Sequence, residues 1–200
     1  FNSIPVPIIT EGATLAFNNC STTTITLSAT NSVTSNGNTY QWFLNGNSIN
    51  VNGNNATYNA TQAGSYSVAI TNNGCTATSP ISKVIAAPSL NAANTAFCAG
   101  TNASIPISGV NTGFTNPSYQ WQISTDGGTT YTNATGAGIN SLTYTATIAG
   151  SYQLVVTDGG VTSTSCPIAV TQFTRPNIII TSPPTNYAAC AGSSVVLFAL

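Results

Sequence analysis

The sequence predicts an all-β protein of antiparallel β-sandwiches, and three observations support this fold class. Hydrophobic residues make up 42% of the 200 residues and alternate with Thr and Ser, which is typical of strands half-buried in a sheet. Asn-Gly dipeptides separate these segments, and Asn-Gly readily forms the tight type I′ turn of a β-hairpin. A long phrase also occurs twice, as AGSYSVAIT from Ala63 and AGSYQLVVT from Ala149.

The individual strands of the first half can be placed from composition. Segments rich in Thr, Val, Ile and Tyr are expected to be strands, and they cover residues 25–29, 39–44, 56–58, 65–71 and 79–85. Asn-Gly pairs at 36–37, 45–46, 52–53 and 73–74 predict chain reversals between or beside them. Strands of this length and spacing favour a sandwich of about seven strands in each unit.

Internal repetition organises the whole chain. Tyr-Gln-Trp at residues 40–42 recurs at residues 119–121, and a cysteine precedes it in each copy, at Cys20 and at Cys98. Cys190 is followed by Ala-Gly, as Cys98 is. The sequence therefore predicts three units: a first repeat at 1–86, a second at 87–174, and the start of a truncated third at 175–200. Proline at each joint favours short, stiff linkers and an end-to-end rod.

The repeated motifs carry a family resemblance. TITLSAT, TYQWFLNG and AGSYSVAIT resemble strands of immunoglobulin-like domains, and their tandem arrangement resembles the repeats of large Bacteroidota cell-surface adhesins of the gliding-motility type. The resemblance implies tandem immunoglobulin-like sandwiches arranged head to tail. It places Trp42 and Trp121 in the cores on strand C, and Tyr66 and Tyr152 in the cores on strand F. It also implies an extracellular position on the surface of a Gram-negative bacterium.

The cores depart from antibody-type domains, in which a disulfide joins strands B and F. Counting from the strand C tryptophan and the strand F tyrosine, the corresponding positions are Ala29 and Val68 in the first repeat. In the second repeat they are Ile107 and Leu154. We therefore expect apolar packing to replace the disulfide between the two sheets.

The five cysteines lie outside the expected core strands. The simple arrangement is two disulfides within repeats, Cys20 with Cys75 and Cys98 with Cys166, with Cys190 left unpaired by truncation. Strand direction leaves an alternative open. A cysteine before strand B and one after strand F lie at opposite ends of a sandwich, too far apart for a disulfide. Cys20 could instead pair with Cys166 across a head-to-tail joint.

The side chains needed for catalysis or metal binding are scarce. The chain has no His and five charged residues, which are Glu11, Lys83, Asp126, Asp158 and Arg175. This inventory predicts no enzyme activity, no cofactor, no metal and no nucleic-acid partner. No stretch approaches the ~18 apolar residues needed to span a bilayer, so we also expect no membrane insertion by this segment. Both Thr-Asp-Gly-Gly segments are expected to be turns. The longer insert of the second repeat, residues 124–140, is the candidate ligand loop, with Asp126 and Tyr131 as its candidate residues.

These observations lead to a non-enzymatic function, a stalk or fibre segment of a bacterial surface adhesin whose partners are neighbouring immunoglobulin-like repeats. One alternative is the subunit of an extracellular filament, in which like subunits assemble when residues 195–200 add a strand to a neighbour's sheet. Another is a carbohydrate-binding module of an exported protein, with surface glycans or another cell as its partner.

Overall fold

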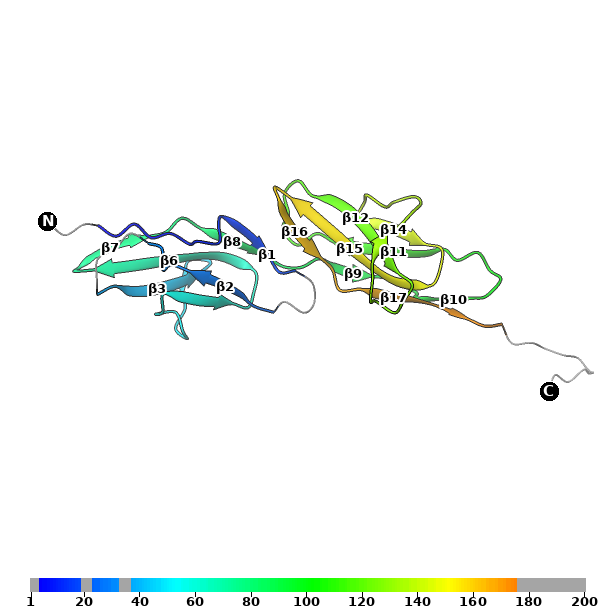
Figure 1. Cartoon of the computed structure of the whole chain (residues 1–200), viewed down its shortest axis with the longest axis horizontal. Helices are drawn as coiled ribbons and strands as arrows, with labels where there is room; N and C mark the ends of the chain where they lie inside the picture. The colour runs from blue at the N-terminus through cyan, green and yellow to red at the C-terminus, as the bar shows by residue number, and fades with distance from the viewer. Residues whose placement is uncertain (1–3, 19–22, 33–36, 176–200) are drawn as a thin grey trace, which may run out of the picture.

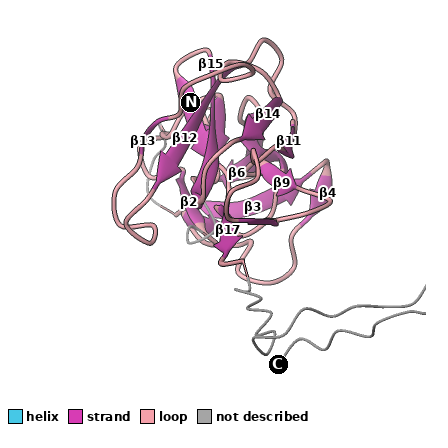
Figure 2. Ribbon diagram, turned by 90° about the vertical axis from the view of Figure 1, so that its right-hand side faces the viewer, coloured by secondary structure: helices cyan, strands magenta, loops and turns pink. Residues whose placement is uncertain are grey.

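The computed structural model describes residues 4–18, 23–32 and 37–175, and its elements in these ranges are β-strands. They form two sandwiches that lie end to end along the longest axis of the molecule (Figure 1). Seen along that axis, the strands of the two sandwiches overlap (Figure 2). This elongated arrangement leaves a single contact region between them.

The first sandwich has one large sheet and one small sheet. The large sheet runs in the order β1 (Thr14–Ala16), β8 (Ser82–Ile85), β6 (Gly64–Asn72), β3 (Thr39–Leu44) and β4 (Asn47–Ser48), and β7 (Cys75–Thr78) also pairs with β6. The small sheet pairs β2 (Ile25–Ser28) with β5 (Thr57–Ala60). β1 is parallel to β8, whereas the other pairs are antiparallel.

The second sandwich has the same strand order. Its large sheet runs β10 (Ala96–Cys98), β17 (Ile168–Phe173), β15 (Gly150–Asp158), β12 (Ser118–Ser124) and β13 (Thr132–Asn133), with β16 (Val161–Thr164) also on β15. The facing sheet contains β14 (Thr143–Ala146), β11 (Ile105–Val110) and β9 (Ser89–Asn91). Two facing sheets with strands C, F and G in one and B and E in the other form an immunoglobulin-like sandwich. The predicted fold class is confirmed.

Each core is built around one tryptophan and two tyrosines. Trp42 and Tyr66 are fully buried in the first sandwich, and the ring of Tyr58 lies between them, with centroids 6.1 and 5.9 Å away. The indole N–H of Trp42 donates to the carbonyl of Asn55 at 2.9 Å, and the Tyr66 hydroxyl donates to the carbonyl of Gln62 at 2.8 Å. Burial therefore leaves neither polar group unsatisfied.

The second core repeats these contacts. Trp121 and Tyr152 are fully buried, and Tyr144 lies between them at 5.6 and 5.7 Å. The Trp121 indole donates to the carbonyl of Ser141 at 2.8 Å, and the Tyr152 hydroxyl donates to that of Ile148 at 2.9 Å. The structure thus places all four aromatic residues expected in the cores at equivalent, fully buried positions.

Only part of the strand predicted at residues 79–85 is observed, as β8 (Ser82–Ile85), and residues 79–81 separate it from β7. β7 and β8 both pair with β6, but the register shifts by one residue between them, which is a β-bulge. Ser79 lies at the bulge, where its hydroxyl accepts the N–H of Val68 at 3.1 Å. Ser165 makes the same contact with the N–H of Leu154 at 2.9 Å. The hydroxyl replaces the strand partner that the bulge removes.

Two of the predicted Asn-Gly turns are confirmed by positive φ at both residues, at Asn45-Gly46 and Asn73-Gly74. The prediction at 52–53 is wrong in type, because Asn52 has a φ of 57° but Gly53 is not among the residues with positive φ. The Gly53 carbonyl instead accepts the N–H of Trp42 at 2.8 Å, so this segment folds back on β3. The pair at 36–37 lies partly outside the described residues.

The register corrects one position in the second core. β2 pairs Leu27 with Tyr58, and β11 pairs Ile107 with Tyr144, so Ile107 corresponds to Leu27. The counterpart of Ala29 is therefore Gly109, two residues after Ile107. A methyl group on Gly109 would lie 2.4 Å from Cδ2 of Leu154. Apolar packing does fill the space of the inter-sheet disulfide, with Leu154 occupying the room that a side chain at Gly109 would take.

The two sandwiches meet in a joint with both apolar and polar contacts. Ile85 at the end of β8 is 3% exposed and belongs to the core of the second sandwich, against which Ala16 also packs. Ser163 Oγ donates to the carbonyl of Phe17, and Lys83 Nζ donates to the carbonyl of Gly113 at 2.9 Å. The Thr112 hydroxyl also donates to the carbonyl of Ala86. The joint is thus a packed interface as well as a linker.

Candidate functional site

Asp126, expected to lie in a ligand loop, binds its own loop instead. Its carboxylate accepts the hydroxyl of Ser124 at 2.6 Å and the backbone N–H groups of Thr129 and Thr130 at 3.0 and 2.9 Å. These hydrogen bonds, led by that of Ser124, hold the pKa of Asp126 well below its usual range. The carboxylate therefore fixes a turn, as its Asp-Gly-Gly context indicates.

Tyr131 is half-buried, and its hydroxyl forms a hydrogen bond with that of Ser151 on β15 at 3.1 Å. The side chain of this candidate ligand-loop residue therefore lies against the sheet. The hydrogen bonds of Asp126 and Tyr131 thus join the two residues to different neighbours, the first within the loop and the second on β15.

The other charged side chains mostly bind the backbone. Glu11 accepts the N–H of Ser28 at 2.8 Å, and Asp158 accepts those of Thr115 and Asn116 at 2.7 and 3.0 Å. Lys83 donates across the joint, as described above. In the described part of the chain, no three His, Cys, Asp or Glu side chains gather where they could hold a metal ion.

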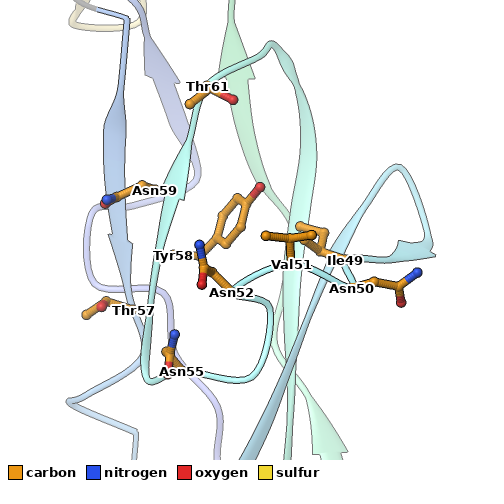
Figure 3. Close-up of a pocket in the computed structure, with 9 residues that line it drawn as sticks. All are labelled: Ile49, Asn50, Val51, Asn52, Asn55, Thr57, Tyr58, Asn59 and Thr61. Carbon is orange, nitrogen blue, oxygen red and sulfur yellow. The ribbon is translucent and has the colours of Figure 1, made fainter.

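A groove in the first sandwich is the best candidate for a ligand site (Figure 3). It has a volume of about 560 Å³ and lies between the connection at residues 49–55 and strand β5. Its lining residues are uncharged and comprise Ile49, Asn50, Val51, Asn52, Asn55, Thr57, Tyr58, Asn59 and Thr61. Carboxamides, hydroxyls and a phenol can both donate and accept hydrogen bonds.

No motif in the sequence marks this groove. Its only signal is the density of Asn between residues 50 and 59, and Asn is frequent along much of the chain. The connection that forms one wall is held by the core: Ile49 N–H donates to the carbonyl of Trp42 at 2.9 Å, and Gln41 Nε2 donates to that of Ile49 at 3.0 Å. These contacts come from tertiary structure and leave no motif.

The cysteines do not form the pairs expected within repeats. Cys75 and Cys98 are free thiols, whereas Cys166 is not. Cys98 lies beside Phe173 at the end of β17, and Cys166 precedes the start of that strand. Six strand residues span about 20 Å, well beyond the ~7 Å that a disulfide tolerates between Cα atoms. Cys20 and Cys190 lie outside the described residues.

Strand pairing also corrects the alignment of the repeats. Ala16 pairs with Ile85, and Ala96 pairs with Thr171, and these two partners hold the same position on β8 and β17. Ala96 is therefore the counterpart of Ala16, so that Cys98 corresponds to Asn18. The sequence places Cys98 and Cys20 in equivalent positions because each precedes the Tyr-Gln-Trp motif. The strand register shows instead that the counterpart of Cys98 lies two residues before Cys20.

Comparisons of the sequence with protein families and with curated proteins find no match. Among the described residues, no helix is long and apolar enough to cross a membrane.

Solved structures give distant likenesses. The three N-terminal domains of the outer capsid protein Hoc of bacteriophage RB49 are 15% identical, with 84% of this chain and 70% of that chain covered and a TM-score of 0.42. The four N-terminal immunoglobulin domains of Dscam1 isoform 6.9 are 11% identical, with 88% and 47% covered and a TM-score of 0.38. The chain thus spans about half of that Dscam1 fragment.

Domains A168–A170 of titin are 11% identical, with 86% and 67% covered and a TM-score of 0.36. TM-scores this low carry no argument about the fold or the function of this chain. The immunoglobulin-like assignment rests on the strand order and the two cores described above.

Proposed function

We propose that this chain is a non-enzymatic, load-bearing segment of an extracellular stalk, as in a surface adhesin of a Gram-negative bacterium. The observation that carries the proposal is the joint. Ile85 of the first sandwich is buried in the core of the second, and hydrogen bonds from Ser163, Lys83 and Thr112 cross between them. A packed joint resists bending and fixes the angle between domains, whereas a flexible linker transmits tension but leaves that angle free.

The low charge supports the same function. The hydrogen bonds that cross the joint between described residues end on backbone carbonyls and not on carboxylates, so there is no ion pair among them for salt to screen. The length of such a segment should therefore be the same in dilute and in concentrated salt.

A disulfide between Cys20 and Cys166 is proposed as part of this joint. Cys166 is not a free thiol, and it follows Ser163 by three residues. Ser163 in turn donates to Phe17, three residues before Cys20. Non-reducing peptide mapping tests the pair: a Cys20–Cys166 peptide supports a joint closed by a disulfide, and a peptide that links Cys166 to any other cysteine contradicts it.

Small-angle X-ray scattering of the purified chain tests the stalk. We expect an elongated monomer whose maximum dimension does not change with salt. Ile85→Asp should introduce a buried charge into the joint and broaden the pair-distance distribution. Ile81→Asp is the matched control, because Ile81 is 61% exposed on the same sandwich. A wild-type chain that already behaves as two freely jointed domains would contradict the proposal.

Assembly into a filament remains the second candidate, favoured by an apolar groove of about 300 Å³ on the first sandwich. Val6, Ile8 and Ile81 line it, and all three are exposed. The donor segment in this hypothesis, residues 195–200, lies outside the described residues. Concentration-dependent assembly that stops when residues 195–200 are deleted would support a filament, and a monomer at all concentrations would contradict it.

A further inference from the structure

We propose that the groove beside Tyr58 is a binding site for a neutral, hydroxyl-rich ligand, namely an oligosaccharide. This inference goes beyond the stalk, since it assigns the first sandwich a ligand of its own. It rests on an unused tyrosine hydroxyl, on free carboxamides around it, and on the absence of charge in the groove.

The hydroxyl of Tyr58 points into the groove (Figure 3) and makes no hydrogen bond with the described part of the chain. The ring itself is held between Trp42 and Tyr66. A donor and acceptor fixed in this way loses little conformational freedom when it binds a ligand, which favours affinity.

The second sandwich provides the comparison, because its equivalent tyrosine is satisfied. Tyr144 is 5% exposed, and its hydroxyl donates to the carbonyl of Thr135 at 2.9 Å. The connection that carries Thr135 also places Ile139 against the core. The carbonyl of Gly53 accepts the N–H of Trp42, and the carbonyl of Ile139 accepts that of Trp121. Gly53 is therefore the counterpart of Ile139 in the connection of the first sandwich. The first sandwich thus lacks the groups that close this site in the second.

The groups around Tyr58 are free to bind a ligand. The carboxamides of Asn52 and Asn55 lie beside Tyr58 (Figure 3) and make no hydrogen bond within the described residues. Each carboxamide offers both donors and an acceptor, which complements the hydroxyl groups of a sugar, since these too donate and accept.

The walls also fit the shape and charge of a sugar. Val51, which is 74% exposed, lies across the groove from Tyr58 (Figure 3) and offers an apolar surface to the C–H face of a sugar ring. None of the nine lining residues is charged. A phosphate, sulfate or carboxylate in this groove would lose hydration without an opposite charge to compensate, so the ligand is expected to be neutral.

NMR titration of the isotope-labelled chain with maltohexaose, cellohexaose and mannohexaose tests the proposal, with hexagalacturonate as the charged comparison. We expect shifts at the backbone amides of residues 49–61 with at least one neutral sugar, and weaker shifts with the uronate. Tyr58→Phe and Asn55→Ala should each weaken binding about three- to tenfold, the effect of one lost hydrogen bond. Unchanged shifts of the two tryptophan indole N–H groups will show that each variant is folded.

Tyr144→Phe is the matched control, since it removes the equivalent hydroxyl from the closed site and should leave the affinity unchanged. Three results would overturn the proposal: no shift in the groove with any neutral hexasaccharide at millimolar concentration, stronger binding of the uronate, or an affinity that neither groove variant reduces.

Discussion

The two sandwiches have separate cores built in the same way. They differ in the connection that passes over the middle aromatic ring, which is Tyr58 in the first and Tyr144 in the second. In the second, the connection closes over Tyr144 and accepts its hydroxyl. In the first, the connection turns back earlier and leaves the hydroxyl of Tyr58 in an open groove. The tryptophan and the corner tyrosine are held identically in both. The core therefore fixes the fold, and the connection decides whether that face carries a groove.

A second difference lies between the sheets. Ala29 and Val68 occupy the sites of the missing disulfide in the first sandwich, and Gly109 and Leu154 occupy them in the second. A larger residue on strand F accompanies a smaller one on strand B. Cores tolerate such paired changes because they conserve volume.

The largest expected effect comes from the shared core. Trp121→Ala should cost about 3–5 kcal/mol of unfolding free energy in the second sandwich, since it empties a fully buried site. Trp42→Ala should do the same in the first. Urea unfolding followed by NMR signals from each sandwich will separate the two. A cost below about 1 kcal/mol for either variant would contradict equivalent cores.

The paired residues between the sheets should show a smaller effect. Gly109→Ala is expected to cost about 1–3 kcal/mol through overpacking against Leu154. The double variant Gly109→Ala with Leu154→Val copies the first sandwich and should recover most of the loss. Equal stabilities of wild type and Gly109→Ala in urea unfolding would show that the contact is not tight.

The two middle tyrosines should respond differently to loss of their hydroxyl groups. Tyr144→Phe breaks the bond to Thr135 and is expected to cost about 0.5–1.5 kcal/mol. Tyr58→Phe should change stability by less than about 0.5 kcal/mol, because its hydroxyl has no partner in the described chain. Thermal unfolding of both variants measures the two stability changes. Equal changes would contradict the difference between a bonded and an unbonded hydroxyl.

The unfolding free energy of both sandwiches should fall at alkaline pH and should not change near neutral pH. Burial, followed by the nearby Tyr144 phenol, raises the pKa of Tyr152 from 10.0 to about 12, and burial raises that of Tyr66 as well. Above pH 10 the unfolded chain releases these protons while the folded chain keeps them. The unfolding free energy should therefore fall as the pH rises from 10 to 12.

Urea unfolding on either side of pH 10 measures this effect. The decline should be shallower in Tyr152→Phe, which has one buried phenol fewer. An unfolding free energy that stays constant up to pH 12 would contradict the burial of these two tyrosines.

The sequence predicted the parts of the fold that depend on local pattern. Alternating residues and the turn at Asn45-Gly46 placed β3 with its observed bounds, Thr39–Leu44. The bulge at Ser79 was missed because its side-chain bond to Val68 depends on a neighbouring strand. The edge strand β1 was missed because it is three residues long and exists only through pairing with β8.

The candidate site could not be predicted in the same way. Asp126 and Tyr131 drew attention as rare polar or aromatic residues in a long insert, but local hydrogen bonds use both. The groove depends on the absence of a contact at Tyr58, and an absence leaves no motif. The predicted pairing of Cys98 with Cys166 was wrong because sequence order does not show which end of β17 each cysteine lies beside. Cys98 pairs with Phe173 at one end of this strand, and Cys166 precedes its other end.

Single-molecule energy transfer between dyes on Cys75 and Cys98 tests the rigid joint most directly. Both are free thiols; Cys75 begins β7 and Cys98 ends β10, two strands that lie in different sandwiches (Figure 1). Replacing Cys20, Cys166 and Cys190 by Ser leaves these two thiols for labelling, whatever the native pairing of Cys166. A packed joint predicts one narrow distribution of transfer efficiency that is the same in dilute and concentrated salt. A broad distribution, or one that shifts with salt, would show independent sandwiches and contradict the stalk.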